Sequence, residues 1–393
     1  MTAEQNVFLA LLRDHVNRAQ TDSVPTELNW EKLHEIAQQQ SLAGLCYAQL
    51  RNSADVPSEV LESFHQDFYG AVYLDANRKA AFHDIAEAFK EAGIAALPFK
   101  GFIVKDYWPV PELRSMGDID LLIHTEDRKR SDEIMRTLGY DCFVDNHAVW
   151  TYTADKLMFE LHDHMFYEHL ANAVDYQGYF DRAWAFCDKG WNENYHFLYL
   201  ITHLAKHIIN KGMGFRAFLD LVFVCQRSKY PLDWDWICKE LEKLQLLDFT
   251  RVCFAFCRGW FGFEPPISVP ELESGFFKDC TEKMFRDGTF GLKNEQNEGA
   301  HAAKEIKRSH GPYWLSALGL TLRRVFPPYR DMQLIPWYSF VDGRPWLLPF
   351  AWVYRWIYCL INKRTQSEAL LTEAFTQRRE IEERQSFIQD WGL

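Results

Sequence analysis

The chain has 393 residues, of which 48% are hydrophobic and 25% are charged. This composition is typical of a globular protein and excludes a disordered or collagen-like chain, and the length predicts two or three domains. The 43 basic and 55 acidic residues give a formal net charge of -12, which argues against a long nucleic acid as partner because phosphate neutralisation supplies most of such binding.

The cysteine pattern and the apolar segments indicate a cytoplasmic protein. Nine cysteines are scattered along the chain without paired short spacings except Cys253 and Cys257, which is typical of reduced thiols. The first 20 residues lack the basic region and the continuous apolar stretch of a signal peptide. Residues 346–361 are the most membrane-like stretch, but Pro349 and Arg355 interrupt it and a spanning helix needs ~20 largely apolar residues.

Residues 1–90 predict an N-terminal helical region. Apolar residues recur at helical spacing from Phe8 and again from Trp30, and Asn29 before the second run is a suitable N-cap. Pro57 and Ser58 open a further helix that continues to about residue 92, with room for one break.

The pattern changes at Gly93, and residues 91–190 predict a small α/β core. Residues 94–99 have the length of a strand, and a helical pattern restarts after the turn at Lys100 and Gly101. The next segments read as strand, helix and three strands, in the order 118–123, 126–138, 140–144, 148–153 and 156–161. We therefore expect a mixed sheet of about five strands with two helices.

Residues 191–393 predict a C-terminal helical domain with a Trp-rich end. Its expected helices cover residues 195–211, 215–228, 234–246 and 250–261, and a charged helix covers 365–387. Residues 287–312 are polar and contain glycine, which favours a mobile loop. The predicted fold class is α+β: a small mixed-sheet core embedded between N-terminal and C-terminal helical regions.

Two carboxylates begin the second predicted strand. Asp118 and Asp120 are two residues apart, so both project from one face of the strand and can converge on one cation. Mg²⁺ is usually held by one or two carboxylates together with substrate phosphates. The alternative is structural: the acids cap a turn at a strand end or pair with Arg114.

The surrounding residues favour the metal. The turn at Lys100 and Gly101 lets a phosphate approach the backbone, offers N–H groups of the following helix and adds a positive charge. Glu160 alternates with Phe159 and Leu161, which predicts a third carboxylate on a later strand. Three carboxylates could hold two ions, one at the attacking hydroxyl and one at the leaving phosphate.

These features resemble the polymerase-beta type of nucleotidyltransferase superfamily. More narrowly, residues 97–140 are similar to the bacterial uncharacterised nucleotidyltransferase family, which has a Lys-Gly turn, an Arg-x-x-x-Asp-x-Asp segment, a Gly-Tyr pair and a Glu-x-His strand. The matching residues are Lys100, Gly101, Arg114, Asp118, Asp120, Gly139, Tyr140, Glu160 and His162. The resemblance extends over most of the chain, although the wider superfamily usually has Gly-Ser or Gly-Gly at the turn.

The resemblance implies a nucleotidyltransferase that moves an NMP from an NTP, such as ATP, to an acceptor hydroxyl and releases pyrophosphate. Asp118, Asp120 and Glu160 would hold Mg²⁺ or Mn²⁺, and Glu160 would also deprotonate the acceptor. Lys100 and Gly101 would bind phosphate, and Arg114 would neutralise the leaving charge. The acceptor is left open among a small molecule, a sugar and a protein hydroxyl.

The helical domain offers further candidates for the substrate side. A helix face with spacing i, i+3, i+4, i+7 carries His203, Lys206, His207 and Asn210, and Arg216 and Asp220 follow closely. We expect Lys206 and His207 to meet the nucleotide, and His162, Arg216 and Asp220 to support the site or the acceptor. Equally, Asp220 could pair with His207 or Arg216 and simply dock two helices.

Two other functions remain as alternatives. His162 and His164, followed by Glu168 and His169, have spacings seen in metal sites and would make the protein a zinc hydrolase. The chain could also be a nucleotide-binding or partner-binding protein without turnover.

The Trp-rich end contains Trp337, Trp346, Trp352 and Trp356 near Arg355, Lys363 and Arg364. Aromatic residues at helical spacing are usually buried, so we expect core or a partner surface here, in preference to contact with a membrane surface.

Overall fold

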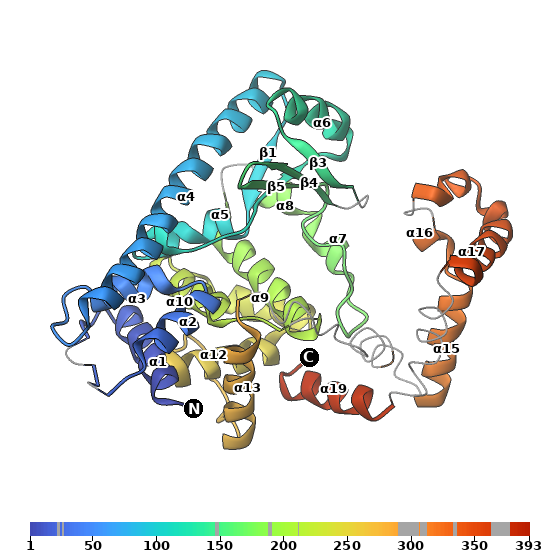
Figure 1. Cartoon of the computed structure of the whole chain (residues 1–393). Coiled ribbons are helices and arrows are strands. Elements are labelled where there is room, and N and C mark those ends of the chain that lie inside the picture. Colours follow the sequence, from blue (N-terminus) through green and yellow to red (C-terminus); the bar gives the residue numbers. More distant parts are fainter. Residues whose placement is uncertain are drawn as a thin grey trace.

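The computed structural model describes residues 1–21, 24–25, 27–145, 149–187, 191–210, 212–289, 306, 313–332, 336–362 and 378–393. In this part of the chain, a five-stranded mixed sheet is flanked by helices from both sides of the sequence (Figure 1). The predicted α+β fold class is therefore confirmed.

The N-terminal helices form as the sequence predicts. They are α1 (Ala3–Val16), α2 (Trp30–Gln39), α3 (Ala43–Leu50) and α4 (Ser58–Glu91). Asn29 caps α2, because its side-chain oxygen accepts a hydrogen bond from the Lys32 backbone N–H at 3.0 Å. Helix α4 runs for 34 residues without the break that we had allowed for, and it extends from the N-terminal helices to the sheet (Figure 1).

The sheet has the strand order β1-β2-β5-β4-β3. The strands are β1 (Ala96–Phe99), β2 (Ile119–Ile123), β3 (Asp141–Asp145), β4 (Val149–Ala154) and β5 (Leu157–His162). Strands β2 and β5 are parallel, and all other neighbours are antiparallel. All five predicted strands are present, each displaced by no more than two residues at its start.

Short helices connect these strands and lead out of the core. The bounds are α5 (Gly101–Val104), η1 (Lys105–Tyr107), η2 (Pro111–Leu113), η3 (Thr125–Asp127), α6 (Arg128–Thr137), α7 (Tyr176–Phe180) and α8 (Ala183–Phe186). Helix α6 ends before Gly139, which adopts the positive φ of 89° that glycine tolerates.

The two faces of the sheet have different chemistry because side chains alternate along a strand. Ile119 and Leu121 of β2 belong to an apolar cluster with Ile85 of α4 and Met135 of α6. Asp120 lies between them in sequence and therefore projects from the opposite face.

The C-terminal domain is helical and rich in aromatic contacts. Its main helices are α9 (Glu193–Asn210), α10 (Phe215–Arg227), α11 (Trp234–Lys243), α12 (Leu247–Phe261) and α13 (Ser274–Asp287). The terminal helix α19 (Arg378–Asp390) returns to this domain, where the ring of Trp391 stacks on Phe256 with a centroid distance of 4.8 Å.

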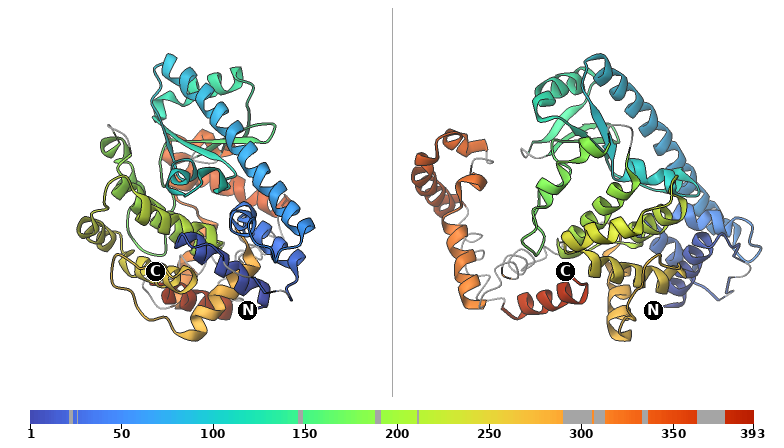
Figure 2. Two further views of the ribbon diagram at one scale, coloured as in Figure 1. Left: turned by 90° about the vertical axis from the view of Figure 1, so that its left-hand side faces the viewer. Right: turned by 180° about the vertical axis from the view of Figure 1, so that it is seen from behind.

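A separate group of helices precedes α19. It comprises α15 (Tyr313–Val325), α16 (Tyr329–Met332), η4 (Pro336–Val341), η5 (Pro345–Leu347) and α17 (Leu348–Asn362). Figures 1 and 2 show α15 to α17 standing apart from the sheet and from the main helical domain. No helix in the described ranges is long and apolar enough to cross a membrane.

Two predictions fall mostly outside the described residues. Of the polar segment 287–312, the structure describes only residues 287–289 and 306. Of the charged helix predicted at 365–387, it describes the part from residue 378 onward, which is helical.

Candidate active site

Three carboxylates come together where β2 begins. Asp120 of β2 is the register partner of Glu160 on the parallel strand β5, so the two side chains share one sheet face. Asp118 lies just before β2 and projects to the same side by strand alternation. The alternation of Glu160 with its apolar neighbours predicted this arrangement, and the register confirms it.

Lys100 occupies the turn between β1 and α5 and contacts this cluster. Its φ of 53° and ψ of -130° are unfavourable for a residue with a side chain. Its ammonium group donates a hydrogen bond to Asp120 Oδ1. The strained residue of this turn is thus Lys100 itself and not the following glycine. Its ammonium group lies against the acids and does not point to solvent.

His162 completes the cluster. Its Nε2 lies 2.9 Å from Asp120 Oδ1 and 3.4 Å from Glu160 Oε2, and its ring packs edge-on against Phe99. Within the described ranges, Asp120, Glu160 and His162 are the group of acidic and histidine side chains whose ligand atoms all lie within 4.8 Å of one another. This set could hold a divalent cation.

Burial and neighbouring charges shift the pKa values of Asp118 and Asp120 in opposite directions. Burial raises the pKa of Asp118 to about 6, and the charges of Asp120 and Glu160 reinforce this shift. Burial also opposes ionisation of Asp120, but Lys100 and His162 outweigh it and hold the pKa of Asp120 at about 2. Lys100 is buried too, yet Asp120 keeps its pKa above the usual value.

Arg114 is already paired. Its Nε and Nη2 donate to the two carboxylate oxygens of Asp220 at 2.9 and 2.7 Å, and Trp108 Nε1 donates to the same carboxylate at 2.8 Å. The sequence offered His207 or Arg216 as a partner of Asp220, and the structure adds Arg114, whose bidentate pair with Asp220 the sequence did not predict. A Cβ placed on Gly101 would lie 2.5 Å from Arg114 Nη1, so this remaining nitrogen lies directly against the turn.

Two further arginines lie near Asp118. Arg216 Nη1 donates to the Ser115 carbonyl at 2.7 Å, and burial together with the charge of Arg114 lowers its pKa to about 10. Arg78 of α4 is partly buried, which lowers its pKa, although the charges of Asp75 and Asp118 oppose this. Arg78 was not predicted from the sequence. The one feature that could have pointed to it is its positive charge in the part of α4 that precedes the sheet.

The α9 candidates have partners of their own. Lys206 Nζ lies 3.1 Å from Glu168 Oε1, and Asn210 donates to the other oxygen of Glu168 at 3.2 Å. His207 Nε2 lies 2.9 Å from His203 Nε2. The pKa of His203 is well below its usual value, mainly through burial and then through the charges of its neighbours, which include Lys100 and His162. This face of α9 therefore lies close enough to Lys100 and His162 for their charges to affect His203.

His164 does not join His162. Its Nδ1 lies 2.6 Å from Asp181 Oδ1, away from the ligand atoms of the cluster. The geometry thus separates the two histidines on which a zinc site was considered.

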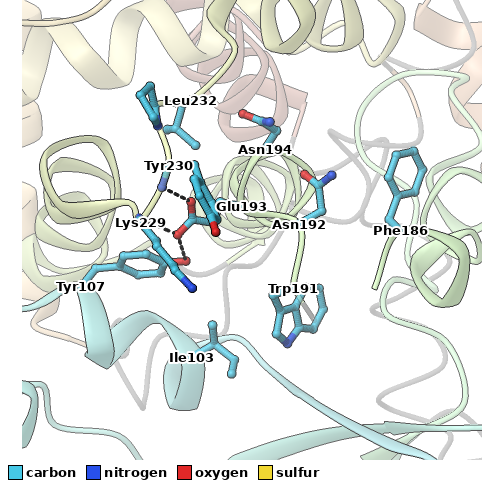
Figure 3. Close-up of a pocket in the computed structure, with 11 residues that line it drawn as sticks. Ile103, Tyr107, Phe186, Trp191, Asn192, Glu193, Asn194, Lys229, Tyr230 and Leu232 are labelled. Carbon is cyan, nitrogen blue, oxygen red and sulfur yellow. Dashed lines mark hydrogen bonds between the residues drawn. The ribbon is translucent and has the colours of Figure 1, made fainter. Parts of the chain in front are cut away.

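A pocket of about 620 Å³ lies beside the same turn (Figure 3). Ile103 of α5 lines it together with Trp191, whose Nε1 donates to the Pro98 carbonyl two residues before Lys100. Glu193 ties its wall together by accepting hydrogen bonds from the Tyr107 hydroxyl and from the backbone N–H groups of the following loop, residues 229–230. The volume is in the range of small-molecule sites.

Predicted site residues that are far apart in the sequence thus lie close together at one end of the sheet. Acids that can hold a cation, a lysine turn and three arginine side chains surround the same point, which suits a reaction in which charge moves between phosphate oxygens.

A comparison with models of protein families gives one match. Residues 26–262 match the family described as uncharacterised nucleotidyltransferase. This match covers more than half of the chain and all the site residues above, so the chain belongs to that family. No match was found among curated proteins, and none among solved structures.

Proposed function

We propose that this member of the uncharacterised nucleotidyltransferase family transfers an NMP from an NTP to an acceptor hydroxyl, with Mg²⁺ or Mn²⁺ as cofactor and pyrophosphate as the second product. One observation carries the proposal: Asp120 and Glu160 are register partners on parallel strands, and Lys100 reaches Asp120 from the adjoining turn. The family assignment supports nucleotidyl transfer in general, and this site supports the finer statement.

The residues fit a hard divalent cation. Asp118, Asp120 and Glu160 supply oxygen ligands, which Mg²⁺ prefers. The Lys100 ammonium contacts Asp120, and burial together with the charges of Asp120 and Glu160 raises the pKa of Asp118. Bound Mg²⁺ would stabilise negative charge on the phosphates and make the acceptor hydroxyl easier to deprotonate.

The chain's own residues would then handle the phosphates and the proton. Lys100, the Gly101 backbone and Arg114 Nη1 form a cationic turn for the triphosphate, and Arg78 and Arg216 lie close enough to support it. The acceptor oxygen attacks the α-phosphorus as the bond to the pyrophosphate oxygen breaks. Glu160 takes the acceptor proton.

His162 would act as a positioning residue. Its Nε2 contact with Asp120 fixes the carboxylate, as outer-shell partners commonly do at metal sites. Asp220 has a similar indirect role through Arg114, since the bidentate pair directs the remaining Arg114 nitrogen toward Gly101. Lys206 and His207 would border the site from α9.

The acceptor would enter through the pocket next to α5. This pocket has room for a small molecule, a sugar or the hydroxyl-bearing loop of a protein, and its wall includes the helix that follows the Lys100 turn (Figure 3). A binding protein without turnover would use the same site, and only product formation separates the two.

The test is transfer of label from α-³²P-labelled NTPs to fractionated small molecules and proteins, with pyrophosphate measured in parallel. We expect label and pyrophosphate to form in equal amounts, to require Mg²⁺ or Mn²⁺, and to be absent for Asp118→Asn with Asp120→Asn. Nucleotide binding without label transfer to any fraction would favour the inactive binding protein, and activity that depends on zinc would favour the hydrolase.

A further inference from the structure

The helices α15 and α17 carry large apolar side chains that face solvent. On α17, besides Leu360, these are Phe350, Val353, Tyr354, Ile357, Tyr358 and Ile361. Their spacing of i, i+3, i+4, i+7, i+8 and i+11 places them on one face of the helix. Phe350 is 69% exposed and Ile361 is 75% exposed, so this apolar stripe is not part of a core in the described structure.

A second set of exposed apolar side chains lies on α15 and η5. Trp314, Leu315, Leu318 and Leu322 of α15 are exposed, and Trp346 at the start of η5 is 68% exposed. Of the two expectations for the Trp-rich end, core or a partner surface, the first is therefore wrong for Trp346. Monomeric proteins rarely leave contiguous apolar surface of this extent uncovered without a binding function.

The opposite face of α17 packs against the end of α15 and the segment that follows it. Trp352 Nε1 and Trp356 Nε1 donate to the carbonyls of Pro327 and Val325, each at 2.8 Å, and both rings contact Phe326 edge-on at 5.2 Å. Because this packing fixes α17 to the end of α15, the stripe on the outer face stays directed away from it.

The charge of this segment is opposite to that of the rest of the chain. Residues 313–364 contain seven basic and two acidic residues, whereas the whole chain has a formal net charge of -12. A second copy of the chain would bring two cationic segments together at this surface, which disfavours self-association through it. An anionic surface would instead attract the segment and repel the acidic remainder.

We propose that α15 and α17 dock on an anionic lipid surface. Tyrosine, tryptophan and arginine beside an apolar stripe are typical of segments that lie in the membrane interface. Helix α17 has 15 residues, too few to span a bilayer, so it would lie in the interface. The charge asymmetry would orient the sheet and its acidic site toward the aqueous side.

The experiment is flotation of the full chain with vesicles of phosphatidylcholine alone or mixed with phosphatidylglycerol. We expect binding to the anionic vesicles that weakens with salt, and a loss of about tenfold or more for Phe350→Glu, Ile357→Glu and Ile361→Glu combined. The matched control places glutamate at three exposed aromatic residues elsewhere, Tyr69, Tyr73 and Phe143, and should bind as the wild type does.

A second measurement does not depend on the folding of the triple variant. Brominated anionic lipids should quench the fluorescence of wild-type protein, and Trp346→Phe should remove part of the quenched signal. The proposal is overturned if no vesicle binds, if neutral and anionic vesicles bind equally, or if the control variant loses binding as the triple variant does. A dimer that the triple variant dissociates, without vesicle binding, would assign the stripe to self-association instead.

Discussion

Two of the lysine–aspartate pairs, Lys105–Asp75 and Lys100–Asp120, have lysines that are five residues apart in the chain. The two pairs have different roles. Lys105 Nζ lies 2.7 Å from Asp75 Oδ1, and Lys79 contacts both Asp75 and Glu112 at 2.8 and 3.1 Å. Asp75 and Glu112 therefore each have a lysine partner, and the attraction of Lys105 and Lys79 keeps the pKa of Asp75 below its usual value despite burial.

The Lys100–Asp120 pair looks similar but is not balanced. Asp118 and Glu160 lie beside it, and burial and repulsion hold the pKa of Asp118 at about 6. Removal of one partner from a buried pair with matched charges destabilises the fold, whereas a pair with further acids beside it leaves a site that a cation can enter. The comparison predicts different responses to mutation and to Mg²⁺ in the two regions.

The largest effect is expected for Lys105→Met. This change removes the Lys105 partner of the buried Asp75 and leaves its contact with Lys79. It should therefore lower the free energy of unfolding by about 3–5 kcal/mol. Urea unfolding with and without Mg²⁺ would measure it. Because the described residues there do not form a group that could hold a metal ion, Mg²⁺ should restore no more stability to this variant than to the wild type, and a specific rescue would contradict the comparison.

Lys100→Met is the matched variant in the other region. Without Mg²⁺ it should lower the free energy of unfolding by about 2–3 kcal/mol, since Asp120 loses its charged donor. Mg²⁺ at ten times its dissociation constant should return about 1.4 kcal/mol, because the cation takes over the charge of the ammonium. Equal unfolding curves with Mg²⁺ and with chelator would argue against a cation site at Asp120.

Asp118→Asn should raise the free energy of unfolding, whereas the two lysine variants lower it. The native pKa of about 6 lies above the ordinary value of 3.8, so the native state binds the proton more tightly and the wild type loses stability as pH rises between these values. At pH 8 without metal, the variant should be more stable by about 1–3 kcal/mol, and at pH 4 the gain should vanish. A variant that is less stable at pH 8 would show that Asp118 is a structural acid.

Arg78→Gln should have the smallest effect. Arg78 lies near Asp118 and is only partly buried, so the free energy of unfolding should change by less than about 0.5 kcal/mol. The affinity for Mg²⁺-NTP should fall by about tenfold through loss of one charged contact to phosphate. Calorimetry on Arg78→Gln and on Lys79→Gln, the neighbouring cation of the balanced region, would separate a role at the site from a general charge effect.

The sequence predicted what depends on local patterns. Strand alternation placed Asp118, Asp120 and Glu160 on one face, and the register of β2 and β5 agrees. It could not predict that Arg114 pairs with Asp220, because 106 residues separate them and no local rule links the two. Arg78 was missed for the same reason.

The apolar face of α17 shows a second limit. Helical spacing of apolar residues is the same pattern whether the face meets a core or a partner, so spacing alone left both open for the Trp-rich end. Only the packing of Trp352 and Trp356 on one face of α17, with Ile361 exposed on another, distinguishes the two.

The central claim is that the surplus acids of the sheet bind a nucleotide through a divalent cation. Calorimetric titration of ATP, GTP, CTP and UTP, with Mg²⁺ and with chelator, tests it most directly on the wild type and on Asp118→Asn with Asp120→Asn. We predict binding of at least one NTP that requires Mg²⁺ and is lost in the double variant. Equal binding by the double variant, or no binding of any NTP, would contradict the account.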